Sequence, residues 1–486
     1  MTTQTDIFRR LVRTHIRPPP VRVAAGTTVG DVVNRMTDLT SAAAVVVDGT
    51  GRPIGIVTEQ DVVRRIAWRT APDRPVETVM SAPVVTAGVD DYLFHAVAVM
   101  RRRKLRHIPI VETDGSLCGM LALHEALALL SGPTMTLIEQ LTHEESVEGL
   151  QRIKAAQVEL ASALFDDNVP VPEVQALLTE INSDIHRRVV RRIAADLAAD
   201  GWGGPPVAFS LIIMGSGGRG ENFLAPDQDN GMILADYPET EHNRITAYFV
   251  ELADRMTRML DAVGFPLCKG YVMATNPVWR KPLAQWRQQV DLWVRRRHER
   301  DLLNAQVLFD FHPIYGDAAP AHALRAHIAR IVPKNSNFLH DIHAADSDHT
   351  VALNWFGGLR GRRDTHNRPG AINLKMNGTL PLVEGVRLLA LRAGIAETST
   401  LARLDALKAK GMVQPQDHDY LVDAIQTITR LLLRQQVADF KAGRDVTDYV
   451  AKASLSKREK EHLVRSFRAI DTFIRVLRSE FGAATG

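Results

Sequence analysis

The pattern of apolar and polar positions divides this chain into a repeated α/β region, a short sheet region and long helical regions. Two apolar runs, residues 211–214 and 232–234, have the length and flanking turn residues of buried strands. Elsewhere, apolar residues recur three and four positions apart, which is the spacing of amphipathic helices. The helices predicted on this basis cover residues 148–165, 171–199, 246–263, 281–297, 382–393, 400–408, 418–441 and 457–481.

Residues 21–130 contain an internal repeat with the order strand, helix, strand, strand, helix. Helical segments at 29–39 and 92–104 each precede an apolar strand, a turn containing Asp and Gly, and a second strand that begins at Gly55 or Gly119. This arrangement resembles a pair of cystathionine-β-synthase (CBS) domains. The resemblance implies a pseudo-symmetric module that binds an adenine nucleotide and forms homodimers.

The resemblance is strongest over residues 55–61, Gly-Ile-Val-Thr-Glu-Gln-Asp. It implies that Thr58 contacts a phosphate and Asp61 contacts the ribose hydroxyls, which suits a hydroxyl at a helix start and a carboxylate acceptor. The second copy departs from this pattern, with Ala122 and Glu125 at the corresponding positions. The alternative interpretation is that Thr58 only caps the next helix and Asp61 is its first-turn acid.

A glycine-rich turn at residues 215–220 directly follows the first apolar run. Glycines let backbone N–H groups approach a phosphate closely. Ten residues separate Ser216 from Asp227. Asp227 and Asp229 are two apart and therefore project from one face of an extended chain. Paired carboxylates suit magnesium, so phosphate groups beside them indicate metal-assisted nucleotidyl transfer.

A third acid, Asp310, lies in the middle of an apolar run at residues 307–314 that predicts a strand. An aspartate at such a position needs a reason, because burying an unpaired charge is expensive. The alternative interpretation makes Asp310 a member of an ion pair and residues 227–229 a turn into a strand.

Together these elements resemble the DNA-polymerase-β-like nucleotidyltransferase superfamily. Residues 215–221 and 227–230 are most similar to a bacterial group of nucleotidyltransferases attached to CBS pairs, related to the protein-PII uridylyltransferases and the glutamine-synthetase adenylyltransferases. The resemblance implies a multidomain α/β fold with a tandem CBS pair, a polymerase-β-like mixed sheet and a helical C-terminal domain. The predicted boundaries are a basic lead-in at 1–20, the CBS pair at 21–130, a helical connector at 131–205, the nucleotidyltransferase domain at 206–320 and the helical domain at 321–486.

The same resemblance assigns roles to residues of the motif. Asp227 and Asp229 would hold two Mg²⁺ ions, and Asp310 would share one ion and help activate the attacking hydroxyl. The β- and γ-phosphates of a nucleoside triphosphate would lie against Gly215 and Ser216, and Arg219 would neutralise charge there.

The C-terminal region offers two further candidates. Residues 371–384 resemble a lysine-plus-glycine segment of the related adenylyltransferases, so Lys375 either reaches the phosphates or is a surface lysine. Residues 340–349 hold a His-Asp dipeptide like that of HD phosphohydrolases, followed by His343, Asp346 and His349. Because no companion set completes a metal site, a polar loop is the preferred interpretation.

Composition changes this picture little. A net charge of +3 on 486 residues does not favour nucleic acid as a partner, and two distant cysteines do not favour disulfides. No apolar run reaches the roughly 18 residues that span a bilayer, so a cytoplasmic protein is expected. We therefore expect Mg²⁺-dependent nucleotidyl transfer, for example uridylyl transfer to a PII-like protein, under control of an adenine nucleotide. The alternative is a catalytically silent nucleotide sensor.

Overall fold

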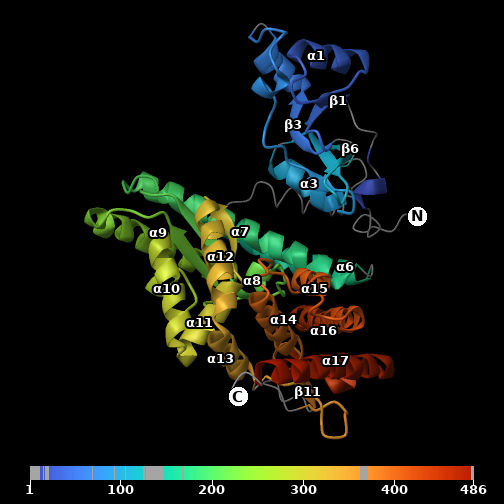
Figure 1. Cartoon of the computed structure of the whole chain (residues 1–486), viewed down its shortest axis with the longest axis vertical. Helices are drawn as coiled ribbons and strands as arrows, with labels where there is room; N and C mark the ends of the chain where they lie inside the picture. The colour runs from blue at the N-terminus through green and yellow to red at the C-terminus, as the bar shows by residue number, and fades with distance from the viewer. Residues whose placement is uncertain are drawn as a thin grey trace. The chain divides into compact units, whose positions relative to one another are not determined.

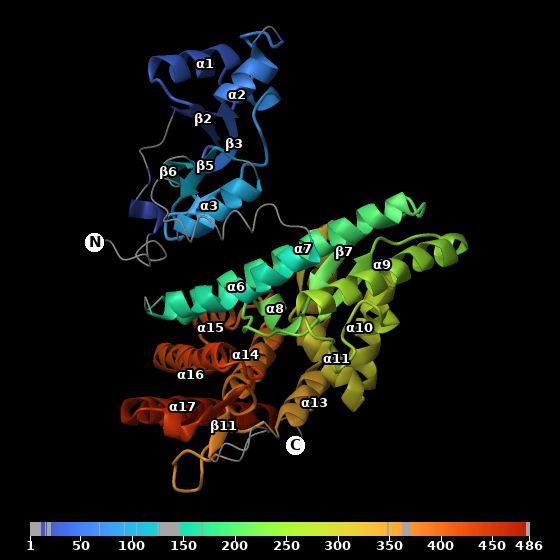
Figure 2. The same ribbon diagram turned by 180° about the vertical axis from the view of Figure 1, so that it is seen from behind.

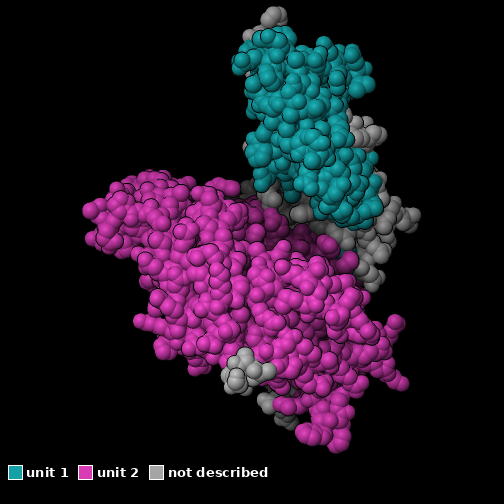
Figure 3. Space-filling view, viewed as in Figure 1, with its two compact units in different colours: residues 1–144, 166–169 teal, residues 145–165, 170–486 magenta. Residues whose placement is uncertain are grey.

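The chain forms two compact units, made of residues 1–144 with 166–169 and of residues 145–165 with 170–486 (Figure 3). The computed structural model describes residues 11–14, 16, 21–67, 69–91, 93–103, 105–123, 126, 146–166, 169–347, 349–361 and 370–482. The predicted class is confirmed: tandem α/β repeats, a mixed sheet and a helical C-terminal part. Across the described residues, no helix has both the length and the apolar character needed to cross a membrane.

The first unit contains the two predicted repeats. The first repeat is built from β1 (Val21–Ala24), α1 (Val29–Asp38), β2 (Ala43–Val47), β3 (Pro53–Thr58) and α2 (Glu59–Asp61). The second is built from β4 (Ala87–Gly88), α3 (Leu93–Arg102), β5 (His107–Val111) and β6 (Leu117–Ala122). In both, the first two strands pair parallel and the last two antiparallel, with a register shift at the equivalent place.

The two repeats contact one another through their strand turns. Arg52 Nη2 donates to the Asp114 carbonyl at 2.9 Å, and Leu117 N donates to the Gly51 carbonyl at 3.0 Å. Leu117 also packs against Val45 and Val47 in a small apolar cluster. The repeats therefore form one module, as the internal symmetry predicts.

The second unit is organised around a four-stranded sheet with the order β10-β7-β8-β9. Its central strands, β7 (Phe209–Ile213) and β8 (Asn230–Leu234), pair antiparallel and are completely buried, which explains their continuous apolar runs. The edge strands are β9 (Arg280–Pro282) and β10 (His312–Gly316). One face is covered by α10 (Leu283–Arg296) and α12 (Ala319–Ile331) (Figure 1). The other is covered by α7 (Val171–Ala199) and α9 (His242–Val263) (Figure 2).

The C-terminal helices continue the same core. Further elements of this unit are α6 (Val147–Asp166), α11 (Glu299–Phe309), α13 (Ser336–Asp346), β11 (Ala371–Asn373), α14 (Leu380–Arg392), α15 (Thr400–Ala409), α16 (Pro415–Lys441), β12 (Tyr449–Ala451) and α17 (Lys457–Gly482). Helices α16 and α17 lie side by side (Figures 1 and 2). Buried residues from the sheet, from α11 and from α14 to α17 form one apolar cluster. The four-stranded sheet and the C-terminal helices therefore pack as one body.

One predicted strand is wrong. Residues 307–314 do not form a continuous strand, because α11 extends to Phe309, Asp310 ends that helix and β10 begins only at His312. A short apolar run has no periodicity that separates a buried strand from the last turn of a buried helix.

Candidate nucleotide and metal site

The glycine-rich turn folds into a five-residue helix, α8 (Gly215–Arg219), immediately after β7. Gly215 has φ +59°, and Gly220 ends the helix in the left-handed region with φ +77°. A Cβ on Gly215 would lie 3.0 Å from Asp229 Oδ2. The turn is therefore rich in glycine because the backbone bends sharply while a carboxylate lies directly against it.

Asp227 and Asp229 are presented by the extended segment that leads into β8. The intervening Gln228 is fully buried, and its Nε2 donates to the carbonyls of Thr257 at 3.1 Å and Phe265 at 2.8 Å. Alternation along an extended chain then turns both aspartates away from that core. Met214 N donates to the Asp229 carbonyl at 2.9 Å, which fixes this segment beside α8.

The two carboxylates lie close enough to share a cation. Ligand atoms of Asp227, Asp229 and Cys268 all lie within 4.8 Å of one another. Burial, together with the negative charge of Asp227, raises the pKa of Asp229 to about 6. A divalent cation would relieve this crowding, so the carboxylate pair fits Mg²⁺.

Cys268 also belongs to this cluster, although no sequence pattern singles it out as a site residue. Burial and the neighbouring Asp229 raise the pKa of its thiol to about 12, so the sulfur stays protonated at neutral pH. Magnesium prefers oxygen ligands. The thiol therefore packs against the carboxylate pair and is a poor Mg²⁺ ligand.

Ser216 and Asp227 line a cleft that also contains Lys375, Asp448 and Tyr449. Lys375 Nζ lies 3.8 Å from Asp448 Oδ2, and its side chain is 49% exposed. The fold thus brings a lysine of the C-terminal region close to the glycine-rich turn at residues 215–220, as the sequence resemblance implied. Its contact with phosphate stays a prediction.

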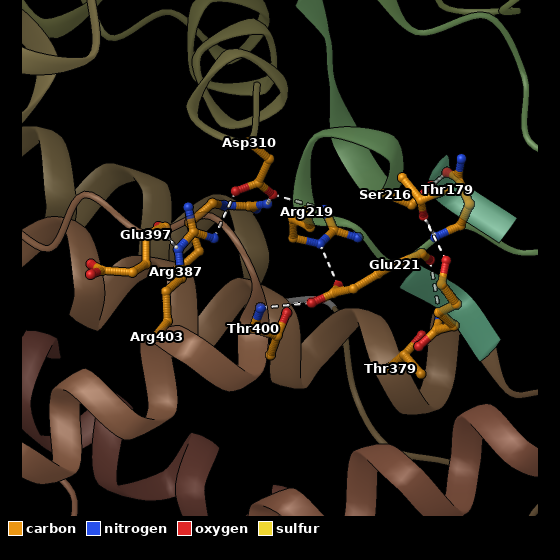
Figure 4. Close-up of polar contacts among 12 residues, drawn as sticks. Thr179, Ser216, Arg219, Glu221, Asp310, Thr379, Arg387, Glu397, Thr400 and Arg403 are labelled. Atoms are coloured by element: carbon orange, nitrogen blue, oxygen red, sulfur yellow. Dashed lines mark hydrogen bonds and ion pairs between the residues drawn. The ribbon is translucent and has the colours of Figure 1, made fainter. Parts of the chain in front are cut away.

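Asp310 does not join this cluster, which corrects the prediction that it shares a metal. Its carboxylate is fully buried and contacts three guanidinium groups (Figure 4). Arg219 Nη1 and Arg387 Nη1 donate to Oδ2 at 2.8 and 2.9 Å, and Arg403 Nη1 donates to Oδ1 at 2.7 Å. Burial alone would raise the pKa of Asp310, but the three arginines outweigh it and hold the pKa below its usual range. Both oxygens are therefore engaged in ion pairs.

Arg219 is also engaged in ion pairs, and its predicted role of neutralising phosphate charge stays a prediction. Besides Asp310, its guanidinium contacts Glu221, with Nε donating to Oε2 at 2.7 Å. Burial opposes the charge of Arg219, but Glu221 and Asp310 raise its pKa above the usual value. Glu221 Oε1 in turn accepts from Thr400 N at 2.6 Å. This network joins α8 to α11, α14 and α15, and nothing local in the sequence indicates it.

Helix α7 positions the loop after α8 from the opposite side. Gln175 Nε2 donates to the Glu221 carbonyl at 2.9 Å, and Asn222 N donates to Thr179 Oγ1 at 3.0 Å. Helix α7, which is part of the helical connector predicted at 131–205, thus directly supports the glycine-rich turn.

In the first unit, Thr58 and Asp61 form a capping box at the start of α2. Thr58 N donates to Asp61 Oδ2 at 3.0 Å, and Asp61 N donates to Thr58 Oγ1 at 3.3 Å. The capping interpretation is confirmed, while nucleotide contact by the same pair stays a prediction. The corresponding Glu125 lies outside the described residues.

Family models match three stretches of this chain. The model described as "Putative nucleotidyltransferase DUF294" covers residues 155–300, and "Putative nucleotidyltransferase substrate binding domain" covers residues 336–481. The CBS domain model matches residues 5–67 and 76–132. These matches confirm the predicted combination of CBS and nucleotidyltransferase-type domains, and the relationship to PII uridylyltransferases stays a prediction.

Similar proteins match over shorter stretches. An uncharacterised 17.7 kDa protein of Acidianus ambivalens is 32% identical over 114 residues, which are 23% of this chain and 69% of that protein. An uncharacterised protein of Methanopyrus kandleri is 30% identical over 102 residues, 21% of this chain and about half (52%) of that protein. A CBS domain protein of Pyrobaculum aerophilum, solved in complex with AMP, has a TM-score of 0.24 and 23% identity, covering 27% of this chain and 98% of that chain.

Proposed function

We propose that this chain transfers a nucleoside monophosphate from a nucleoside triphosphate to a hydroxyl of a protein acceptor. The proposal is supported by the matches to the CBS domain, to the nucleotidyltransferase domain DUF294 and to the nucleotidyltransferase substrate binding domain. In this reaction, the bond between the α-phosphorus and the bridging oxygen of the β-phosphate breaks. A bond to the acceptor oxygen forms, pyrophosphate leaves, and the hydroxyl proton passes to solvent.

The observation that carries the proposal is the convergence of Ser216, Asp227 and Lys375 on one cleft, with the carboxylate of Asp229 within 4.8 Å of that of Asp227. The Ser216 hydroxyl and the backbone N–H groups of the glycine turn are donors suited to phosphate oxygens. The ammonium group of Lys375 offsets negative charge at the same place. Asp227 and Asp229 would hold the cation.

A magnesium ion bound there would neutralise charge that develops on the phosphoryl oxygens. The chain's own contribution is rigidity: Met214 and Gln228 fix the aspartate segment from both sides through backbone and amide hydrogen bonds. Preorganised groups cost no rearrangement when charge develops, so this fixed geometry supports the transfer step.

The acceptor and the regulator come from the family resemblance. In its more specific form, the proposed reaction is uridylyl transfer to a PII-like signalling protein. An adenine nucleotide bound at Thr58 and Asp61 would set the activity, and the CBS pair would form a homodimer. Regulation requires that this nucleotide bind two arrangements of the chain with different affinity.

A second candidate function is supported by the position of Asp310. The resemblance implies three metal-binding acids, and the ion pairs with Arg219, Arg387 and Arg403 remove one of them. A site with two carboxylates that binds a nucleotide without turning it over would make the chain a nucleotide sensor.

The test incubates the full-length chain with Mg²⁺, each of the four α-³²P-labelled ribonucleoside triphosphates and cell extract, and measures label on protein and pyrophosphate release. We expect transfer to fall at least 100-fold in Asp227→Asn/Asp229→Asn. The control Asp254→Asn, which alters an exposed pair with Arg258, should transfer normally. Equal labelling by the double variant would exclude this site, whereas Mg²⁺-dependent binding of nucleotide without pyrophosphate release would establish the sensor.

A further inference from the structure

A second group of metal-type ligands lies in the C-terminal domain. Ligand atoms of Asp346, His349 and Glu384 all lie within 4.8 Å of one another. His349 Nδ1 is 2.9 Å from Glu384 Oε2, and Glu384 is 6% exposed. The preferred interpretation of this segment as a polar loop is therefore wrong, because residues 336–346 form α13 and its end meets α14.

The His-Asp dipeptide that suggested a metal is not part of this group. His340 Nδ1 lies 2.8 Å from the Phe481 carbonyl oxygen, and Asp341 pairs with Arg297 at 3.0 Å. The cluster uses instead the last residue of α13, a residue just beyond it, and Glu384 on α14.

The three side chains border a small cavity, which is a feature independent of the ligand cluster. Its volume of about 20 Å³ is close to that of one water-sized sphere, so it has room for a single ion. His343 lines the same cavity, and it lies three residues before Asp346 on the same face of α13.

A buried amide also faces the cluster. Gln306 is 5% exposed, its Nε2 has no hydrogen-bond partner of normal geometry, and this group faces the Asp346 carboxylate. Its Oε1 accepts from Arg387 Nη2 at 2.5 Å. Carboxylates that ligate a metal are themselves hydrogen-bonded by a second group, and this unused donor of Gln306 is available for that contact.

The charges in this cluster are unbalanced. Two carboxylates share a mostly buried space with the His349 imidazole, which lies 2.9 Å from Glu384 Oε2, and Arg387 already pairs with Asp310. Such crowding is costly unless a proton or a cation occupies the space between the acids.

We propose that Asp346, His349 and Glu384, with His343 at the cavity wall, form a second divalent metal site. Mixed imidazole and carboxylate ligands suit Zn²⁺ or Mn²⁺ better than Mg²⁺, which prefers oxygen alone. The site ties the end of α13 to α14, and Arg387 on α14 reaches Asp310. The bound ion therefore stabilises the packing of the helices that contact the glycine-rich turn.

The test uses full-length Asp227→Asn/Asp229→Asn protein, which removes the first cluster. Equilibrium dialysis against Zn²⁺ or Mn²⁺ alone, followed by metal analysis, should find about one bound ion. Adding His349→Ala or Glu384→Gln should weaken binding at least tenfold. His418→Ala is the matched control, because His418 also lies beside two acids, Asp405 at 2.7 Å and Asp419 at 2.9 Å, and it should leave binding unchanged.

Absence of bound metal in the parent protein, or equal binding after His349→Ala and Glu384→Gln, would overturn the proposal. Metal-edge X-ray absorption of the loaded parent protein keeps the proposal testable if those variants fold poorly. Imidazole scattering mixed with oxygen supports the site, and a shell of oxygen alone contradicts it.

Discussion

Gly218 lies directly against the backbone of Asp310. A Cβ on Gly218 would come within 1.7 Å of the Asp310 carbonyl oxygen and 2.9 Å of the Ile213 carbonyl oxygen. This contact places α8 on the end of α11. The glycine-rich turn and Asp310, with its three arginine partners, therefore form one rigid unit.

Gly218→Ala should therefore destabilise the protein. Neither obstructing atom belongs to a flexible side chain, so the backbone must move, at a cost of about 2 kcal/mol or more. Urea denaturation measures the change. Gly204→Ala is the control, because nothing lies within 4 Å of a Cβ at that position. If both variants unfold at the wild-type midpoint, α8 and Asp310 are not packed as described.

Asp310→Asn should destabilise the fold by about 3–5 kcal/mol, because it leaves three buried guanidinium groups without their shared carboxylate. Since the pKa of Asp310 is lowered in the folded protein, its stabilisation is present above its usual value of 3.8 and is lost as pH falls below that value. The acid limb of a stability–pH curve should be flatter in the variant.

Asp310→Asn also separates the structural role from a metal-binding role. At a temperature where the variant is folded, its Mg²⁺ affinity should stay within about twofold of wild type, whereas Asp229→Asn should abolish binding. A comparable loss of affinity in both variants would restore Asp310 as a metal ligand.

Asp229→Asn should stabilise the metal-free protein. Burial and Asp227 raise the pKa of Asp229 to about 6, so stability should fall as pH rises from about 4 to 6. A shift of this size corresponds to roughly 2–3 kcal/mol, which the neutral amide recovers at pH 7 in EDTA. Thermal unfolding with EDTA and with Mg²⁺ should show Mg²⁺ stabilising wild type and not the variant. A variant less stable than wild type in EDTA would refute this charge crowding.

Asp61→Asn tests the regulatory site. If its carboxylate binds ribose hydroxyls, affinity for AMP or ATP should fall about tenfold, because a hydrogen bond to a charged acceptor contributes about 1.5–3 kcal/mol. Calorimetric titration measures this affinity. Glu59→Gln changes an exposed acid two residues away and serves as control. Unchanged nucleotide affinity in Asp61→Asn would leave Thr58 and Asp61 with only their role in capping α2.

The sequence alone was enough to predict features that depend on neighbours along the chain. The repeated order of the CBS halves, the strand–turn–strand arrangement around Ser216 and the shared face of Asp227 and Asp229 follow from periodicity and local backbone geometry. These are short-range properties, because alternation and turn chemistry act over a few residues.

The electrostatic roles were decided only by tertiary structure. Asp310 fits an acid of a metal site until packing brings in Arg387 and Arg403, which are 77 and 93 residues away. Likewise Glu384 meets His349 only because α14 packs against the end of α13. The sequence places a carboxyl group in the chain, but its ion-pair partner is set by which surfaces the core buries together, and no local pattern encodes that choice.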